Sequence, residues 1–224
     1  MSKVPFFDPR QVPVVGVDAH LPRVDARHLR PDALVARFAS PPLWTPEMVA
    51  EPRFSERLPV RASVLVPLVV RERLTVLLTQ RTQHLSSHSG QIAFPGGKAD
   101  PQDRDAVATA LREAHEEIGL QESQVQVLGS LPVYTTGSAY WVTPVVALVR
   151  EDFQPIRNTF EVEDVFEIPL DFLVDPANHR RHAVLWEGVT REWLSMPYLD
   201  GDTERFVWGA TAGMLRNLYQ FLVA

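Results

Sequence analysis

A glycine pair followed by a helical pattern, between Gly96 and Leu120, constrains this chain more than any other segment. Glycine lets the backbone approach a ligand closely, and a helix N-terminus favours negative charge. The segment from Asp103 to Ile118 is predicted to be that helix, because apolar residues recur three and four positions apart, at Val107, Ala110, Leu111 and Ala114. Gly119 is placed to end it. A phosphate is expected to bind at the glycines, although an ordinary strand-to-helix turn would use the same residues.

Three glutamates gather near the end of this predicted helix, at Glu113, Glu116 and Glu117. Residues four apart share a helix face, so Glu113 and Glu117 are expected to lie one turn apart, where like charges repel. A hard divalent cation such as Mg²⁺ or Mn²⁺ relieves that repulsion and prefers carboxylate oxygen. Arg112 lies four residues before Glu116 and is expected to pair with it and orient it. The alternative is an acidic helix face that only meets solvent.

The rest of the chain favours one α/β domain with an N-terminal extension. Residues 1–60 are rich in proline and are predicted to form an arm packed on the core, with one short helix from Pro31 to Phe38. Residues 61–224 are β-rich and end in a predicted helix from Gly209 to Leu222. The predicted strands are RASVLVPLVV, LTVLLTQR, Gln91 to Phe94, VQVLGSLPVY, WVTPVVALV, HAVLW and EWLSMPY. Together they predict one mixed sheet, with a helix after its third strand and another at the end.

Composition excludes several classes of protein. The chain has 224 residues, 45% of them hydrophobic and 22% charged, as is ordinary for a globular domain. Its net charge of −6 argues against a general nucleic-acid coat or a binder of anionic membranes. The absence of cysteine excludes disulfides, thiolate metal sites and cysteine nucleophiles. No signal-peptide pattern and no apolar run near the roughly 18 residues of a membrane span is visible, so we expect a cytoplasmic protein.

The segment from Gly97 to Leu120 resembles the signature of the Nudix family, which reads Gly, five residues, Glu, seven residues, Arg-Glu-apolar-x-Glu-Glu-x-Gly-apolar. Its second half is matched in full, by Arg112, Glu113, Ala114, Glu116, Glu117, Gly119 and Leu120. In the first half one residue is inserted, since counting from Gly97 puts Asp103 at the glutamate position, whereas counting back from Arg112 puts Arg104 there. We expect a carboxylate of the loop to take the place of that glutamate: Asp100, Asp103 or Asp105.

Two stretches narrow the resemblance to the coenzyme A pyrophosphatase subgroup. The loop KADPQD is similar to the subgroup's GGKxDPxD version of the signature, and LLTQRTQHLSSHSGQIAFPGG, from Leu77 to Gly97, resembles the approach to it. Later fragments agree: Thr135 to Val146, Glu161 to Leu170 and Val207 to Leu215. The resemblance implies the Nudix fold, an α/β/α sandwich with a mixed central β-sheet, over residues 61–224. It also implies a metal-dependent pyrophosphohydrolase that cleaves coenzyme A or acyl-coenzyme A into 3′,5′-ADP and phosphopantetheine or its acyl derivative.

Two alternatives to this function stay open. One is a Nudix pyrophosphatase that acts on ADP-ribose, nucleotide sugars or capped RNA. The other is a nucleotide-sensing module that keeps the fold without catalysis. Such modules commonly lose signature carboxylates, so the intact Glu113, Glu116 and Glu117 favour an enzyme. The expected partner is a small nucleotide substrate, and a homodimer is left open.

The expected metal site uses the signature's own oxygen atoms. The ligands are carboxylates and one backbone carbonyl: Glu113, Glu116, Glu117 and Gly97 or Gly96. Bound Mg²⁺ or Mn²⁺ would lower the pKa of an attacking water, and Glu116 or Glu163 would take its proton. Glu161 is a second candidate on the same late loop, and Arg112 is expected to act by orienting Glu116.

Four residues are expected to bind the substrate. Arg81 ends a predicted strand beside the glycines and can clamp a phosphate through its guanidinium, although a surface charge would look the same. Lys98 and the backbone of Gly96 have a similar role, and Tyr140 is expected to contact the nucleotide or pantetheine arm, with core packing as the alternative. His84 and His88 are expected to form hydrogen bonds within their loop, because a zinc site needs more ligands.

Overall fold

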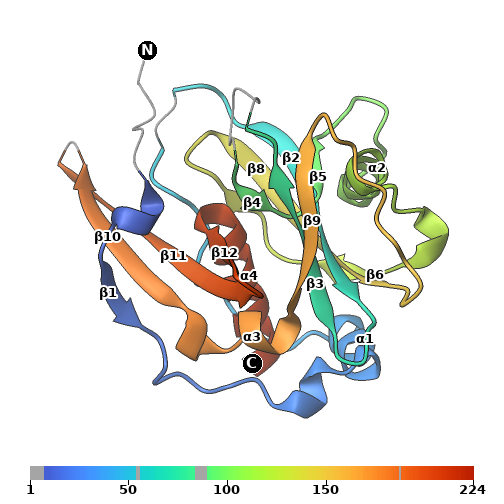
Figure 1. The fold of residues 1–224 in the computed structure, drawn as a ribbon, viewed down its shortest axis with the longest axis horizontal. Helices are drawn as coiled ribbons and strands as arrows, with labels where there is room; N and C mark the ends of the chain where they lie inside the picture. The colour runs from blue at the N-terminus through green and yellow to red at the C-terminus, as the bar shows by residue number, and fades with distance from the viewer. Residues whose placement is uncertain (1–7, 54–55, 84–89, 187) are drawn as a thin grey trace.

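The computed structural model describes residues 8–53, 56–83, 90–186 and 188–224, which form two β-sheets with helices between and outside them (Figure 1). The larger sheet has eight strands: β2 (Val60–Val69), β3 (Thr75–Arg81), β4 (Ile92–Ala93), β5 (Gly96–Lys98), β6 (Val125–Ser130), β7 (Tyr134–Thr135), β8 (Tyr140–Val149) and β9 (Val162–Pro169). Five strands follow one another in the order β4-β3-β2-β8-β6. Of the other three, β5 pairs with β2, β7 with β8 and β9 with β3.

The centre of this sheet is a parallel pair, β2 and β8, in register from Val60 opposite Tyr140 to Val69 opposite Val149. The neighbouring pairs, including the β2–β3 hairpin, are antiparallel. Most of β2 is buried, as a continuous apolar run in the middle of a sheet should be. The predicted hairpin and the predicted mixed sheet are therefore confirmed.

The late strands form a second, antiparallel sheet. Its order is β1 (Val14–Val17), β10 (Arg180–Trp186), β11 (Val189–Asp200) and β12 (Thr203–Trp208). The prediction that all strands share one sheet was wrong, because an alternating apolar pattern identifies a strand without identifying its partner. β1, β9 and β12 were not among the predicted strands, and β1 comes from the proline-rich first 60 residues.

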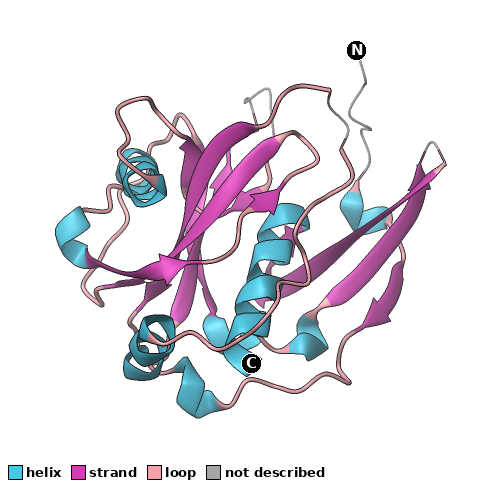
Figure 2. Ribbon diagram, turned by 180° about the vertical axis from the view of Figure 1, so that it is seen from behind, coloured by secondary structure: helices cyan, strands magenta, loops and turns pink. Residues whose placement is uncertain are grey.

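Helices lie on both sides of the larger sheet, so the α/β/α fold class is confirmed (Figure 2). On one side, α2 (Ala106–Ile118) packs Ala110, Ala114 and Ile118 against buried side chains of β2, β3 and β8. On the other side, α4 (Gly209–Val223) lies between the two sheets. It contributes Leu215 and Leu218 to the larger of the two hydrophobic cores, called the main core below. The remaining helical segments are α1 (Pro31–Ala39), α3 (Leu170–Leu173) and the 3₁₀ turns Pro9–Gln11, Ala26–Leu29, Glu122–Gln124 and Pro176–Asn178. Across the described ranges, no helix has both the length and the apolar character needed to cross a membrane.

The ends of α2 are set by two capping residues. The helix begins at Ala106, later than predicted, because Asp105 is extended and its side chain accepts a hydrogen bond from the backbone N of Ala108 at 2.8 Å. Gly119 ends the helix as predicted, with a left-handed φ of 71° and its N–H bonded to the carbonyl of His115. These caps fix which residues of α2 face β5.

Candidate active site

The glycine pair belongs to a strand, β5, which is antiparallel to β2. Close packing requires glycine at both positions. A Cβ on Gly96 would lie 2.5 Å from the backbone oxygen of Ser63, and a Cβ on Gly97 would lie 2.4 Å from a carboxylate oxygen of Glu113. The two glycines therefore bring the backbone of β5 directly against the first carboxylate of α2.

Glu113 and Glu117 turn toward this strand from one face of α2, as predicted. We call their side chains, together with the backbone of Gly96 and Gly97, the carboxylate corner. Glu117 is only 3% exposed, and the backbone N of Gly96 donates to its Oε2 at 3.3 Å. Burial raises the pKa of Glu117 to about 8 and also raises the pKa of Glu113. Glu117 is buried and Glu113 is partly buried, so a divalent cation beside them would stabilise the charged form of both carboxylates.

Arg112 lies beside the carboxylate corner and forms hydrogen bonds with the loop before α2 and with the helix itself. Its guanidinium donates to both carboxylate oxygens of Asp103 at 3.0 Å and to Oε1 of Glu113 at 2.9 Å. The predicted pair with Glu116 is also present, at 3.3 Å, and Nη2 donates to the carbonyl of Lys98 at 3.0 Å. Arg112 thus joins the loop after β5 to two carboxylates of the helix.

Asp103 is the loop carboxylate that joins this network. It also accepts hydrogen bonds from the hydroxyl of Thr109 and the backbone N of Asp100, both at 2.8 Å. The bonds from Arg112 hold the pKa of Asp103 well below its usual range. Asp105 caps α2 instead. The sequence left three candidates because a loop and two turns of helix separate Asp103 from Arg112, and the spacing alone cannot show how that loop folds back.

Arg81 reaches the carboxylate corner from the end of β3. Its Nη1 lies 3.7 Å from Oε1 of Glu117, and its side chain is 26% exposed. Its Nε is buried and has no hydrogen-bond partner among the residues that the structure describes. A guanidinium that has an N–H group without a hydrogen-bond partner is suited to bind an anion such as phosphate. This burial disfavours the alternative of a solvated charge at a strand end.

Two glutamates of the late loop differ in their relation to the carboxylate corner. The negative charge of Glu161 raises the pKa of both Glu113 and Glu117. Glu163 is exposed and lies where the register of β9 on β3 shifts, so that it forms a β-bulge. Glu161 thus adds negative charge near the carboxylate corner, and the roles of Glu161 and Glu163 stay predictions.

The backbone of β5 offers one carbonyl to the carboxylate corner. The carbonyl of Pro95 accepts from the backbone N of Leu65 and so points to β2. Carbonyl directions alternate along a strand, so the carbonyl of Gly97 also points to β2 and that of Gly96 points away from it. The N–H of Gly96, which lies on the same side as its carbonyl, bonds to Glu117. Gly96 is therefore the better backbone ligand, ahead of Gly97.

These donors fit a hard divalent cation. The carboxylates of Glu113 and Glu117 and the carbonyl of Gly96 are oxygen atoms of the kind that Mg²⁺ and Mn²⁺ prefer as ligands. In the described part of the chain no three His, Asp or Glu side chains stand close enough together to hold a metal ion by themselves. Arginine side chains contact the carboxylates instead, so a cation would compete with them for the same oxygens.

The other predicted site residues lie around the carboxylate corner or away from it. The side chain of Glu116 is 53% exposed, and Lys98 is exposed beside the glycines. Tyr140 packs against the main core and donates its backbone N–H to the hydroxyl of Thr136, which favours the core-packing alternative. His84 and His88 lie outside the described residues.

A family model for the NUDIX domain matches residues 59–187, more than half of the chain. This chain belongs to the Nudix family. It is 42% identical over 160 residues to the uncharacterized Nudix hydrolase NudL of Yersinia pestis (strain Pestoides F), covering 71% of this chain and 78% of that protein. NudL of Yersinia pseudotuberculosis serotype O:1b (strain IP 31758) matches equally. A solved C. elegans Ap4A hydrolase binary complex is similar at 22% identity and a TM-score of 0.43, over 53% of this chain and 85% of that chain.

Family membership confirms that the chain is an enzyme, a pyrophosphatase of the Nudix hydrolases. Nudix hydrolases generally use divalent metal ions and act on small nucleotide substrates, in agreement with the oxygen ligands of the carboxylate corner. The matched region ends at residue 187, so β1, β11 and β12 of the second sheet lie outside it.

Proposed function

We propose that this Nudix hydrolase cleaves the diphosphate of coenzyme A or acyl-coenzyme A, giving 3′,5′-ADP and phosphopantetheine or its acyl derivative. The observation that carries the proposal is the position of Arg81, 3.7 Å from Glu117 with a buried Nε that lacks a partner among the described residues. Arg81 ends the LLTQR strand, within the stretch from Leu77 to Gly97 that resembles the coenzyme A subgroup. That stretch therefore supplies a phosphate-binding group directly beside the carboxylates.

In this proposal Glu113, Glu117 and the carbonyl of Gly96 would hold Mg²⁺ or Mn²⁺, and such an ion, when bound, would supply positive charge for the diphosphate and a lowered pKa for the attacking water. Arg81 binds a phosphate oxygen through its unused N–H groups, and the exposed Lys98 is a second cation for the substrate. Arg112 does not touch the substrate in this scheme. It keeps Glu113 and Glu116 in position through its bonds to Asp103 and Lys98.

We propose Glu161 as the carboxylate that takes the proton from the attacking water, ahead of Glu116 and Glu163. A general base must reach that water within hydrogen-bond distance. Burial is the main cause of the raised pKa of Glu113 and Glu117, and the negative charge of Glu161 adds to it, which supports Glu161 as the candidate from the late loop. Glu116 is held by Arg112 and turned to solvent, and Glu163 lies in the exposed bulge.

A substrate panel tests the proposed function. Purified protein with Mg²⁺ or Mn²⁺ would be assayed against coenzyme A, acetyl-coenzyme A, dephospho-coenzyme A, ADP-ribose, a nucleotide sugar, a dinucleoside polyphosphate and capped RNA, with products separated by chromatography. We expect the highest kcat/KM for coenzyme A or its acyl ester, with 3′,5′-ADP as a product. Much faster hydrolysis of ADP-ribose or of a dinucleoside polyphosphate would overturn the assignment. A Glu117→Gln preparation purified in parallel controls for contaminating activity.

A further inference from the structure

We propose that Arg205, in β12 of the second sheet, is a positioning residue of the active site, because it fixes the start of β9 and with it Glu161 and Arg81. The inference rests on the proposed function of those two residues. Arg205 lies outside residues 59–187, so it belongs to a part of the chain that the family model does not cover. The second sheet would then contribute to catalysis and not only to stability.

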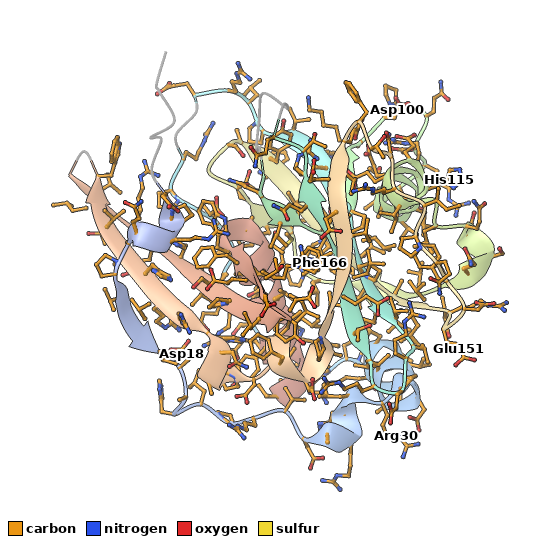
Figure 3. The ribbon with its side chains drawn as sticks, viewed as in Figure 1. Asp18, Arg30, Asp100, His115, Glu151 and Phe166 are labelled. Carbon is orange, nitrogen blue, oxygen red and sulfur yellow. The ribbon has the colours of Figure 1, made fainter. Side chains whose placement is uncertain are left out.

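Arg205 is held in one place by contacts with both sheets. Its Nη1 lies 2.7 Å from Oδ2 of Asp164 in β9, and its Nε and Nη2 lie 3.2 Å from Oδ2 of Asp200 in β11. The guanidinium carbon stands 4.0 Å from the centre of the Phe166 ring, which lies between the sheets (Figure 3). Its side chain is only 12% exposed. The side chains of Asp164 and Asp200 are 42% and 43% exposed, so the guanidinium, which packs on the Phe166 ring, is the fixed member of this contact.

Asp164 is the first regularly paired residue of β9 after the bulge. It pairs with Gln80 of β3, whereas Val162 pairs with the next residue, Arg81, so that Glu163 is the extra residue between them. A slip of one residue would turn every side chain of a strand to the opposite face. The ion pair of Arg205 with Asp164 fixes the position of the bulge in β9, and the position of the bulge determines where Glu161 lies.

A second contact from the same part of the chain holds the other side of β3. The buried hydroxyl of Thr211, at the start of α4, donates to the carbonyl of Ile92 in β4 at 3.1 Å. Ile92 also pairs with Gln80. The row Ile92, Gln80 and Asp164 is thus held at both ends by β12 and α4, one row before Arg81. We infer that these contacts set the width of the site between β4 and β9.

The chain offers a matched control in Arg71. Its Nη2 lies 2.6 Å from Oε1 of Glu167, near the other end of β9, and its side chain is 29% exposed. Glu167 pairs with Leu77, four residues before Arg81. Replacing Arg71 therefore removes a similar ion pair from the same strand, away from Glu161.

The experiment compares Arg205→Met, Arg205→Lys, Asp164→Asn and Arg71→Met, using the full chain and the best substrate of the panel. Steady-state kinetics, a pH–rate profile, Mn²⁺ affinity and thermal unfolding would be measured for each.

We expect Arg205→Met and Asp164→Asn to lower kcat by about 10- to 100-fold, as a misplaced reacting group does, with much smaller changes in KM and Mn²⁺ affinity. A chain that carries both Arg205→Met and Asp164→Asn should have a kcat no lower than that of either single variant, because the two changes break the same contact. Arg205→Lys should recover part of kcat, and Arg71→Met should lower stability and leave kcat unchanged.

Wild-type kcat in Arg205→Met, or an equal loss in Arg71→Met, would overturn the inference. If Arg205→Met does not fold, Asp164→Asn and Arg205→Lys decide by the same criteria. An enzyme that prefers ADP-ribose to coenzyme A would refute the proposed substrate and leave this test intact. A wild-type chain that hydrolyses no diphosphate would refute both.

Discussion

Glu117 is the most deeply buried carboxylate of the active site, and its surroundings explain why one side chain should control metal binding. A buried carboxylate with a raised pKa binds a cation only by giving up its proton. Replacing Glu117 by Gln keeps the size of the side chain and removes its charge. We expect this variant to lose Mn²⁺ binding in calorimetry and to abolish turnover, with an unchanged circular dichroism spectrum. Glu122→Gln, which removes an exposed carboxylate just beyond the same helix, is the control and should retain Mn²⁺ binding. Near-normal turnover in the Glu117 variant would contradict the assignment.

The raised pKa of Glu117 also predicts how pH changes the stability of the metal-free enzyme. Its pKa is about 8 in the folded chain against an ordinary value of 4.5, so the folded state binds a proton that the unfolded state has lost. Stability from this group is complete below about pH 4.5 and is lost as pH rises toward 8, by about 1.4 kcal/mol per unit of difference.

Urea unfolding in EDTA between pH 6.5 and 8.5 tests this sign. Below that range the buried His179, whose pKa burial lowers to about 4, acts in the opposite direction. The wild type should lose stability across the range and Glu117→Gln should lose less, whereas saturating Mg²⁺ should reverse the wild-type trend. Equal slopes for the two metal-free proteins would show that Glu117 is not the group involved.

At the scale of elements, the loop between β5 and α2 is held by Asp103. Removing the charge of Asp103 would release Arg112, which would then compete more strongly with a cation for Glu113. Partners that orient metal ligands typically change metal affinity or activity by about 10- to 100-fold, so we expect a loss of that size for Asp103→Asn. Asp105→Asn is the control, because it removes one charge from the same loop and keeps a good helix cap. Equal Mn²⁺ affinities for these two variants would exclude the proposed role of Asp103.

The elements that the sequence predicted well are those defined by local pattern. Helix α2, its glycine end and the β2–β3 hairpin follow from periodicity and turn residues within one segment. The strand β5 was missed because two glycines carry no alternation, and they pair only through close contact with β2. The second sheet and the contact of Arg205 with Asp164 were also missed, since both join residues far apart in the chain. In the site, the spacing of Glu113 and Glu117 was readable, whereas the position of Glu161 depends on a bulge.

At the scale of the whole molecule, the N-terminal residues are tied to the core by a buried group of charges. Arg216 of α4 is 1% exposed, and its guanidinium lies 3.1 Å from Asp18 and 2.6 Å from Glu47. Arg181 of β10 bonds to the same two carboxylates. His179 donates from Nε2 to the carbonyl of Leu173, so its Nδ1 accepts from Arg216 at 2.9 Å. The division of the chain at residue 60 stays a prediction, and this network indicates that the two parts unfold together.

Replacing Asp18 tests whether the arm and the catalytic domain form one cooperative unit. Asp18→Asn leaves the buried Arg216 short of a counter-charge, and removing one partner of such a pair costs about 3–5 kcal/mol. Asp32→Asn is the control: its pair with Arg30 has side chains 69% and 70% exposed, and such an exposed pair contributes little to stability. Urea unfolding followed by both circular dichroism and tryptophan fluorescence should give one transition, shifted strongly by Asp18→Asn. A small shift, or a separate early transition, would mean that the arm folds independently of the Nudix core, and the buried charges would then serve some purpose other than joining them.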